Sequence, residues 1–516
     1  MSSELKIGWG KADVTPKGPC MLAGQMGNRL ALEVIDPLTT TALALESGDE
    51  KVIIISLDSV SFQPSLMEEV RKRVHEATGV PELNITGSAT HTHTAPQYGD
   101  VIPEKDWNHP YRGTRCRGNI GIIPAEIRKE HPDFVDSEQY FDFLSERISG
   151  AAVSAWQDRK PGKAAYGLGT ACVGESRRLV MEFRGGVMYA LEDDPALLHA
   201  EGHVDHTVNV LATYTPEGKL TGMIVNIACP AQVSEALSLV SADYWNEVRQ
   251  EIVRHLGEGI YLLPQCSAAG DISPHQLLNR RAQARMMQLR GQLKDPVLDW
   301  KWVSRVHNVD YCLARRKEIG RRVMLALEDV LGVIGGTANG APVLKHVCKM
   351  LQLPPRQITE EEAEAAQKSA EKLEEHFRVN EGGIWNGSVN WNRGVVERYK
   401  NPPKAIPMEL HVIRLGEVAF ATNSYELYLD YGDRIKGGSR AEQTFLVQLA
   451  SGRGSYLPSR RSGTTGYGSA PASSLVTFDG GNMIVEESRR QYDRRGIGQN
   501  DQFPVLIRYH SAKERK

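Results

Sequence analysis

The 516-residue sequence lacks the segments that direct a chain into or across a membrane. Its first residues, MSSELKIGWGKADVTP, contain neither the basic stretch nor the following apolar stretch of a secretory signal. No later run approaches the roughly 20 apolar residues of a membrane-spanning helix. We therefore expect no integral membrane segment and a cytoplasmic location.

The sequence also lacks a strong charge imbalance and a cysteine framework. Its formal net charge is only -3, which gives no electrostatic reason to expect a nucleic-acid partner. The 7 cysteines are dispersed and include no CxxC pair, which argues against disulfide bridges and against a thiolate zinc cluster. No internal repeat is visible. We expect a globular protein that acts on a small-molecule substrate, and the sequence leaves its oligomeric state open.

Two parts of the chain show strand, helix, strand patterns that end in a polar loop. In the first, residues 51–57 (KVIIISL) form an apolar run of buried-strand type, and residues 63–77 carry apolar side chains at helical spacing. A short strand at 83–86 then leads into SATHTHTAP. In the second, the predicted elements are a strand at 223–229, a helix at 244–256 and a strand at 260–266, followed by SAAGDISPH. The pattern predicts an α/β fold with a mixed β-sheet core and helical layers, and polar loops after strands favour an active site.

The second half of the chain contains two further amphipathic segments. Residues 308–331 predict a long helix with one apolar face. Residues 359–377 begin with a capping-box pattern and expose many Glu and Lys, which indicates a surface helix. Residues 380–404 are rich in Asn, Gly and Pro and predict an irregular loop before strands at 410–422. We expect a single catalytic domain over residues 1–516 with a helical and loop insertion around 340–404.

The segment SATHTHTAP carries the clearest signal for chemistry. His91 and His93 are two residues apart, so on an extended backbone they point the same way and could face one cleft. The small and hydroxyl residues around them leave room for an ion or a substrate and supply hydrogen bonds that fix imidazole tautomers. An HxH pair also occurs in ordinary surface positions, but its place directly after a strand favours a metal or substrate site.

A set of short segments resembles, in the same order, the N-terminal catalytic domain of the neutral/alkaline (non-lysosomal) ceramidases. They are KADVTP (11–16), VIDPL (34–38), SLDSV (56–60), SATHTHTAP (88–96), NIACPAQV (226–233), SADYW (241–245), SAAGDISP (267–274), NSYELY (423–428) and SYLPS (455–459). The resemblance implies the ceramidase catalytic-domain fold, one zinc ion per chain and amidase activity, the hydrolysis of an N-acyl bond. It implies His91, Glu426 and Tyr456 as zinc ligands, which are donor types that catalytic zinc accepts.

The resemblance also implies roles for residues around the metal. Ser273, in GDISP, takes the place of the nucleophile, and His93 that of a neighbour which positions or protonates the substrate. Arg177 and Tyr467 take the places of groups that contact the polar end of the substrate. A serine beside a metal ion suits acyl transfer from an amide, although Ser before Pro in a turn is commonly an ordinary loop residue. The nucleophile could therefore be Ser273 or a water activated by the metal.

One position departs from the family pattern. The second histidine ligand lies in a block of the form ACHP, but this chain has Ala228-Cys229-Pro230-Ala231, and proline cannot bind zinc. His275 is the first candidate to complete the site. His203, His206 and an inward-turned His93 are the others. The remaining possibilities are a weaker or different divalent metal, or loss of the metal.

The substrate is a second point of departure. Family members are exported and carry a further β-sandwich-like domain at the C-terminus, and we expect neither here. Arg453, Arg460 and Arg461 favour a polar or anionic substrate over two alkyl chains, unless they are merely solvated or paired. The alternatives to an amidase are a metal-dependent hydrolase of an ester, lactone or glycosidic bond in a polar or sugar-derived molecule, and a degenerate binding protein without catalysis.

Overall fold

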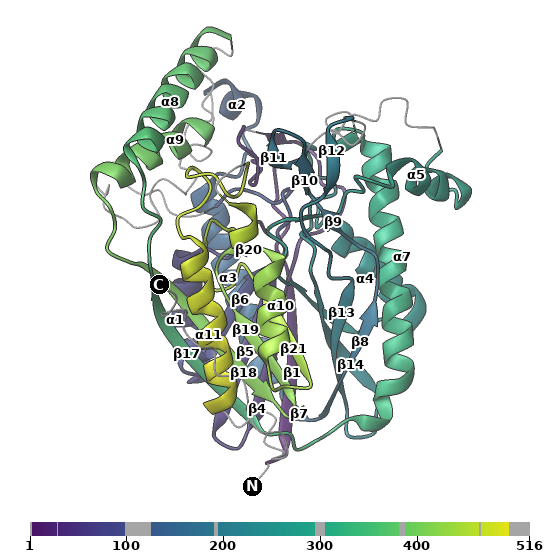
Figure 1. Ribbon diagram of the computed structural model, residues 1–516. Helices are drawn as coiled ribbons and strands as arrows, with labels where there is room; N and C mark the ends of the chain where they lie inside the picture. The colour runs from purple at the N-terminus through teal and green to yellow at the C-terminus, as the bar shows by residue number, and fades with distance from the viewer. Residues whose placement is uncertain are drawn as a thin grey trace.

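The computed structural model describes residues 3–27, 29–98, 125–189, 194–294, 305–380, 387–463 and 466–494. Within these residues, the larger sheets are mixed sheets that lie side by side in the centre, with helices on the outside (Figure 1). The predicted α/β class with a mixed-sheet core is confirmed. Among the described helices, none has the length and apolar character needed to span a bilayer.

Each of the three main sheets is built in the same way. Three strands pair antiparallel in chain order, a helix crosses over, a fourth strand pairs parallel to the third, and a further helix packs on the first strands. The first unit comprises β1 (Leu5–Asp13), β4 (Thr39–Ser47), β5 (Glu50–Leu57), α1 (Pro64–Thr78), β6 (Ile85–Ala89) and α3 (Ser137–Gln157).

The same order of elements recurs twice more along the chain. The second unit comprises β8 (Lys163–Thr170), β13 (Thr207–Tyr214), β14 (Leu220–Ile227), α4 (Tyr244–Leu256), β15 (Tyr261–Cys266) and α7 (Val309–Ile334). The third comprises β17 (Leu344–Leu353), β18 (Ile406–Leu415), β19 (Val418–Thr422), α10 (Leu429–Gly438), β21 (Gln443–Val447) and α11 (Phe478–Arg494). The structure thus contains a threefold repeat that the sequence does not reveal.

Shorter elements decorate these units. The short strands are β2 (Cys20–Met21), β3 (Leu30–Ala31), β7 (Lys160–Pro161), β9 (Glu175–Ser176), β10 (Arg178–Met181), β11 (Gly185–Met188), β12 (Leu197–Ala200), β16 (Ile272–Ser273), β20 (Glu426–Leu427) and β22 (Tyr456–Leu457). The remaining helices are α2 (Ala125–Glu130), α5 (Arg280–Leu289), α8 (Glu360–Asn380) and α9 (Gly387–Lys400), with 3-10 turns at Glu82–Asn84, Gly335–Thr337 and Arg460–Ser462. Figure 1 shows α8 and α9 side by side, projecting from the body.

The apolar run of β5 is buried on both of its faces. Val52 and Ile54 point into a core that all three sheets share, where they join residues such as Phe420 of β19. Ile53 and Ile55 point the other way, against α1 and α3. Since successive strand residues face opposite sides, a strand between two packed layers favours consecutive apolar residues, as at Val52 to Ile55 in this run.

Most predicted elements are confirmed, and α4 has the predicted bounds 244–256. The capping box at the start of α8 is also present, with Thr359 and Glu362 bonded to each other's backbone. The prediction of a loop at 380–404 was wrong, because residues 387–400 form α9. Packing against α8 stabilises this helix despite its Asn and Gly content. The predicted insertion around 340–404 corresponds to a sheet strand, β17, followed by these two helices.

The loops after the parallel strands meet at one edge of the molecule. The amide of Ser451, after β21, donates to the carbonyl of Gly87 in β6 at 2.7 Å, and the amide of Ala231, after β14, donates to Thr90 at 3.1 Å. The amide of Gln448 donates to the end of β15 at 3.0 Å. These bonds bring loops from all three units together at this edge.

A buried arginine of α7 braces this edge. The Arg316 guanidinium donates to Asp36 at 2.6 Å, to Glu247 of α4 at 3.0 Å and to the Ser241 hydroxyl at 2.8 Å. The Ser241 carbonyl in turn accepts hydrogen bonds from the Thr92 and Thr94 hydroxyls, at 2.9 and 2.8 Å. The blocks around 36 and 241 therefore support the histidine loop rather than supply chemistry.

We predict that Arg316→Met lowers the free energy of unfolding by about 3–5 kcal/mol, because two carboxylates are left buried without a cation. Urea unfolding followed by circular dichroism measures this loss. The matched control is Arg321→Met, on the same helix but with a side chain 36% exposed, which should change the free energy by less than about 1 kcal/mol. Equal losses in the two variants would contradict the bracing role.

Candidate functional site

His91 lies in the loop after β6 in a strained backbone conformation. Its φ is 66°, in the left-handed region that a non-glycine residue rarely adopts. Nδ1 lies 2.7 Å from the carbonyl of Val60, so this nitrogen carries the proton and donates. In the neutral ring the lone pair then lies on Nε2, which points into the site toward Glu426 and His93. This tautomer, fixed by a backbone carbonyl, is typical of metal-ligating histidines.

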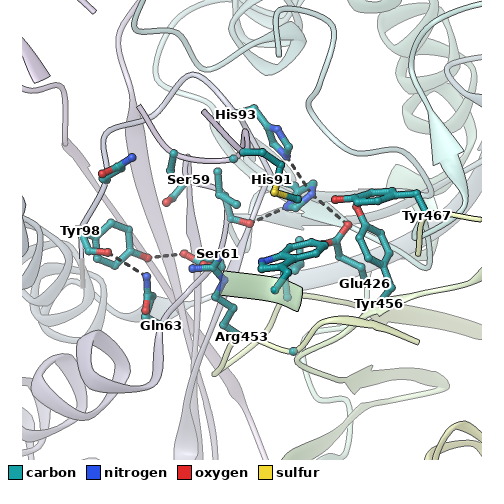
Figure 2. A pocket seen from close by; sticks show the side chains of 18 residues that line it. Ser59, Ser61, Gln63, His91, His93, Tyr98, Glu426, Arg453, Tyr456 and Tyr467 are labelled. Carbon is teal, nitrogen blue, oxygen red and sulfur yellow. Dashed lines mark hydrogen bonds and ion pairs between the residues drawn. The ribbon is translucent and has the colours of Figure 1, made fainter. Parts of the chain in front are cut away.

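Glu426 and Tyr456 come together because β20 and β22 pair in parallel with these two residues opposite each other. The Tyr456 hydroxyl donates to the Glu426 carboxylate. Glu426 Oε2 lies 3.4 Å from His91 Nε2. Figure 2 shows the three predicted metal ligands side by side in one pocket. The structure thus brings together residues that are 30 to 365 positions apart in the sequence.

The Glu426 carboxyl is held in its charged form. Burial acts to raise its pKa, but the neighbouring His91 and Arg177 and the hydroxyl of Tyr456 together lower the pKa below its usual value. Burial also raises the pKa of Tyr456 well above its usual range, so its hydroxyl is a donor here. A carboxylate therefore faces the lone pair of His91, an arrangement that favours a cation between them.

His93 lies on the other side of His91. The two Nε2 atoms are 3.3 Å apart, and the side-chain amide of Gln232 lies 2.7 Å from His93 Nε2. Burial, with the neighbouring His91 and Arg29, holds the pKa of His93 well below its usual range, so its ring is neutral. Gly24 packs against this ring so closely that a Cβ atom would lie 2.4 Å from the ring carbon Cγ.

Arg177 and Ser273 belong to one hydrogen-bond chain beside the pocket. Arg177 donates to Tyr456 at 3.1 Å, to the Gly270 carbonyl at 2.7 Å and to the Tyr189 hydroxyl at 2.9 Å. Tyr189 in turn is hydrogen bonded to Ser273. Ser273 is fully buried and lines neither cavity described below. This series of hydrogen bonds links the predicted nucleophile Ser273 to the predicted metal ligand Tyr456. Tyr189, which is bonded to Ser273, lines a cavity, whereas Ser273 does not.

Two cavities meet at His93, Tyr456 and Tyr467. The cavity that contains His91 and Glu426, named the main cavity for these residues, has about 820 Å³ of empty space and is also lined by Ser59, Gln63 and Arg453. The side cavity has about 880 Å³ of empty space and is lined by Arg177, Tyr189, Gln232, Glu235 and His307. The predicted metal ligands therefore border the main cavity, and the predicted substrate residue Arg177 borders the side cavity.

Tyr467 and Trp391 form an aromatic wall of the main cavity. Their rings are 5.9 Å apart and nearly parallel, and the Tyr467 ring stands edge-on to Tyr456 at 5.2 Å. Trp391 belongs to α9, so the insertion contributes directly to the cavity. Sequence reasoning missed this residue because it assigned the segment to a loop.

The alternative histidines lie elsewhere. His275 Nε2 donates to the Gln232 carbonyl at 3.1 Å, and burial with nearby Arg305 and Arg315 lowers its pKa to about 3. His203 is exposed and pairs with Asp433 at 2.9 Å, while His206 lies 3.9 Å from the Cys172 sulfur. None of these three lines either cavity. The structure brings His91, His93, Glu426 and Tyr456 together, and not His275.

Sequence reasoning also missed Gln232, Glu235 and Tyr189. Gln232 and Glu235 follow the predicted strand at 223–229, and that position could have singled them out. Burial raises the pKa of Glu235 to about 7, although Arg177 and Arg29 act to lower it. No comparable feature of the sequence would have identified Tyr189.

The chain contains other His, Cys and carboxylate groups close enough to hold a metal ion. Among the described residues, Cys348 with Glu409 and His411, and His203 with Asp430 and Asp433, have donor atoms within 4.8 Å of one another. In the first group, the Arg71 guanidinium donates hydrogen bonds to both carboxylate oxygens of Glu409, at 2.9 and 2.6 Å. This fixed positive charge disfavours a second cation there. The second group is exposed, and acidic clusters on a surface are common without a metal.

The residues around His91 fit a divalent metal. An imidazole nitrogen and a carboxylate oxygen are donors that zinc accepts, and two donors on one tetrahedral zinc lie about 3.3–3.5 Å apart. The observed His91 to Glu426 separation of 3.4 Å falls in this range.

Comparison with known proteins supports the fold. No protein-family model and no curated protein matches the amino-acid sequence. Among solved structures, a neutral ceramidase from Pseudomonas aeruginosa superposes with a TM-score of 0.64 at 16% identity, covering 96% of this chain and 75% of that one. A ceramidase complexed with C2 matches with a TM-score of 0.64 at 14% identity, covering 98% and 76%. The chain therefore has the fold of the neutral ceramidases.

Proposed function

We propose that the protein is a zinc-dependent hydrolase that cleaves an N-acyl amide bond. The observation that carries this proposal is the meeting of His91, Glu426 and Tyr456 at the wall of one cavity, with a carboxylate facing an imidazole lone pair. The fold, which is that of the neutral ceramidases, supports the same reaction class.

In this proposal the chain's own groups orient the substrate and handle charge. A bound zinc ion would polarise the scissile carbonyl and lower the pKa of a water to about 7. Arg177 donates to the Tyr456 oxygen at 3.1 Å and so holds this candidate zinc ligand in place beside Glu426. Ser273, held by Tyr189, is the candidate nucleophile, and its attack requires Tyr189 to swing aside because Ser273 lines neither cavity.

A second candidate is a hydrolase of an ester, lactone or glycosidic bond in a polar or sugar-derived molecule. The lining of the main cavity favours it, since Ser59, Gln63 and Arg453 accompany the aromatic wall. Such a mixed lining suits a substrate with several polar groups better than two alkyl chains. The two candidates differ in the substrate and in the need for Ser273.

The metal is tested first. Protein purified without chelators should contain about one zinc per chain, and His91→Ala and Glu426→Gln should each remove the zinc together with hydrolysis. Loss of the metal should also lower the unfolding midpoint, because a ligand that binds only the native state stabilises it. Atomic absorption and thermal unfolding measure these effects.

The matched controls are exposed residues of the same types. His203→Ala and Glu417→Gln, whose side chains are 53% and 44% exposed, should leave zinc content and hydrolysis unchanged. Wild-type protein that holds no zinc would argue for the degenerate binding protein.

The bond and the nucleophile are tested together. A fluorescent N-acyl sphingosine should be compared with small amides, esters, lactones and glycosides. If the amide is the substrate and Ser273 the nucleophile, Ser273→Ala should lower kcat/KM for amides by on the order of 10³-fold or more. Ser267→Ala, which removes a buried hydroxyl from the same loop, is the control and should retain activity. Full amide cleavage by Ser273→Ala would assign the attack to water instead.

A further inference from the structure

The inference concerns what replaces the imidazole missing at position 230, and it rests on the proposed metal site. Pro230 directly precedes Ala231, whose amide donates to Thr90 at 3.1 Å, so position 230 adjoins the residue before His91. Proline offers no side-chain donor. A nitrogen from another part of the chain is therefore needed beside His91 to restore a second imidazole.

We propose that His93 is this second imidazole ligand and that Glu235 is the carboxylate that positions it. His93 Nε2 lies 3.3 Å from His91 Nε2, within the range of about 3.3–3.5 Å for two nitrogens on one tetrahedral zinc. With Glu426, the two histidines make the two-histidine, one-carboxylate set of a common class of catalytic zinc site.

The surroundings of His93 suit a ligand. Its Nδ1 lies 3.9 Å from the Glu235 carboxylate and 3.4 and 3.5 Å from the side-chain amide nitrogens of Gln232 and Gln25. When these amides turn away, Nδ1–H can donate to Glu235 and leave Nε2 for the metal. Metal-bound histidines usually donate their other ring N–H to a carboxylate or carbonyl, and Val60 plays the same part for His91. Each imidazole would then bind the metal through Nε2 and donate from Nδ1 to a protein oxygen, that of Val60 for His91 and that of Glu235 for His93.

Binding requires a rearrangement, because the donor atoms of His91, His93 and Glu426 do not all lie within 4.8 Å of one another. Figure 2 shows His93 and Glu426 approaching the His91 ring from different sides, so the His93 side chain must turn toward Glu426 for the donors to share one cation. The Gln232 amide, now 2.7 Å from His93 Nε2, must also release that nitrogen. Its amide nitrogen already lies 3.3 Å from Glu235 Oε2, which can keep it hydrogen bonded.

The position of Gly24 restricts where this ring can lie. A Cβ atom at residue 24 would lie 2.4 Å from His93 Cγ, and the φ of Gly24 is +98°, where side chains are strained. Glycine thus lets the loop at 23–26 close against the imidazole and hold it near His91. His275, the other candidate, lines neither cavity.

Metal affinity of the intact protein, measured with a competing chromophoric chelator, tests the inference independently of activity. His93→Ala and His93→Gln should weaken Co²⁺ and Zn²⁺ binding by more than about 100-fold, and Glu235→Gln by about 10–100-fold. His275→Asn and Glu417→Gln should bind as the wild type does. The visible spectrum of the Co²⁺ protein should change in Glu235→Gln, since a merely structural role would leave the ligand field unaltered.

The outcomes separate this inference from the proposed function. If the wild type binds no metal, the proposed function fails and this inference with it. If His91→Ala loses the metal but both His93 variants keep wild-type affinity, only the inference about His93 fails. Loss of affinity in His275→Asn with retention in the His93 variants would assign the ligand to His275. Circular dichroism of each metal-free variant shows whether it folds. If one of the two His93 variants misfolds, the other still tests the inference.

Discussion

The site depends on one electrostatic constraint, the buried carboxylate of Glu426 facing the lone pair of His91 at 3.4 Å. Val60 accepts a hydrogen bond from Nδ1 of His91, so a neutral ring presents the lone pair of Nε2 to the carboxylate. Two electron-rich groups held face to face in a buried place are stable only with a positive charge close by. Arg177 supplies part of this charge at 3.9 Å, and a metal ion between the donors would supply the rest.

The architecture explains how such a pair is held in place. Each of the three repeated units ends its parallel strands at the same edge, and each contributes part of the site: His91 after β6, the Gln232 and Glu235 segment after β14, and Glu426 after β19. Backbone hydrogen bonds of 2.7 to 3.3 Å join these loops to one another. A strained backbone at His91 is tolerated because the surrounding sheets determine its position.

The helices between β17 and β18 contribute an aromatic residue to the wall of the main cavity. α8 and α9 are placed between β17 and β18, and they carry Trp391 to the mouth of the main cavity, where it stacks on Tyr467. This wall lies beside Tyr456, a candidate metal ligand. The predicted metal ligands thus come from loops of the repeated units, while Trp391 in the cavity wall comes from the two helices between β17 and β18.

The sequence alone determined the elements and the chemistry of individual residues. Apolar periodicity located β5, α1, α4, β15 and α7, and the resemblance to ceramidases singled out His91, Glu426 and Tyr456, because local patterns and short motifs survive in a linear chain. Only the tertiary structure decided that Glu426 pairs with Tyr456 across two short strands, that Glu235 and Gln232 reach His93, and that His275 is turned toward a backbone carbonyl. These facts depend on contacts between residues far apart in the chain. The threefold repeat was hidden for a related reason, since its units share strand order and packing but not side chains that would mark them in the sequence.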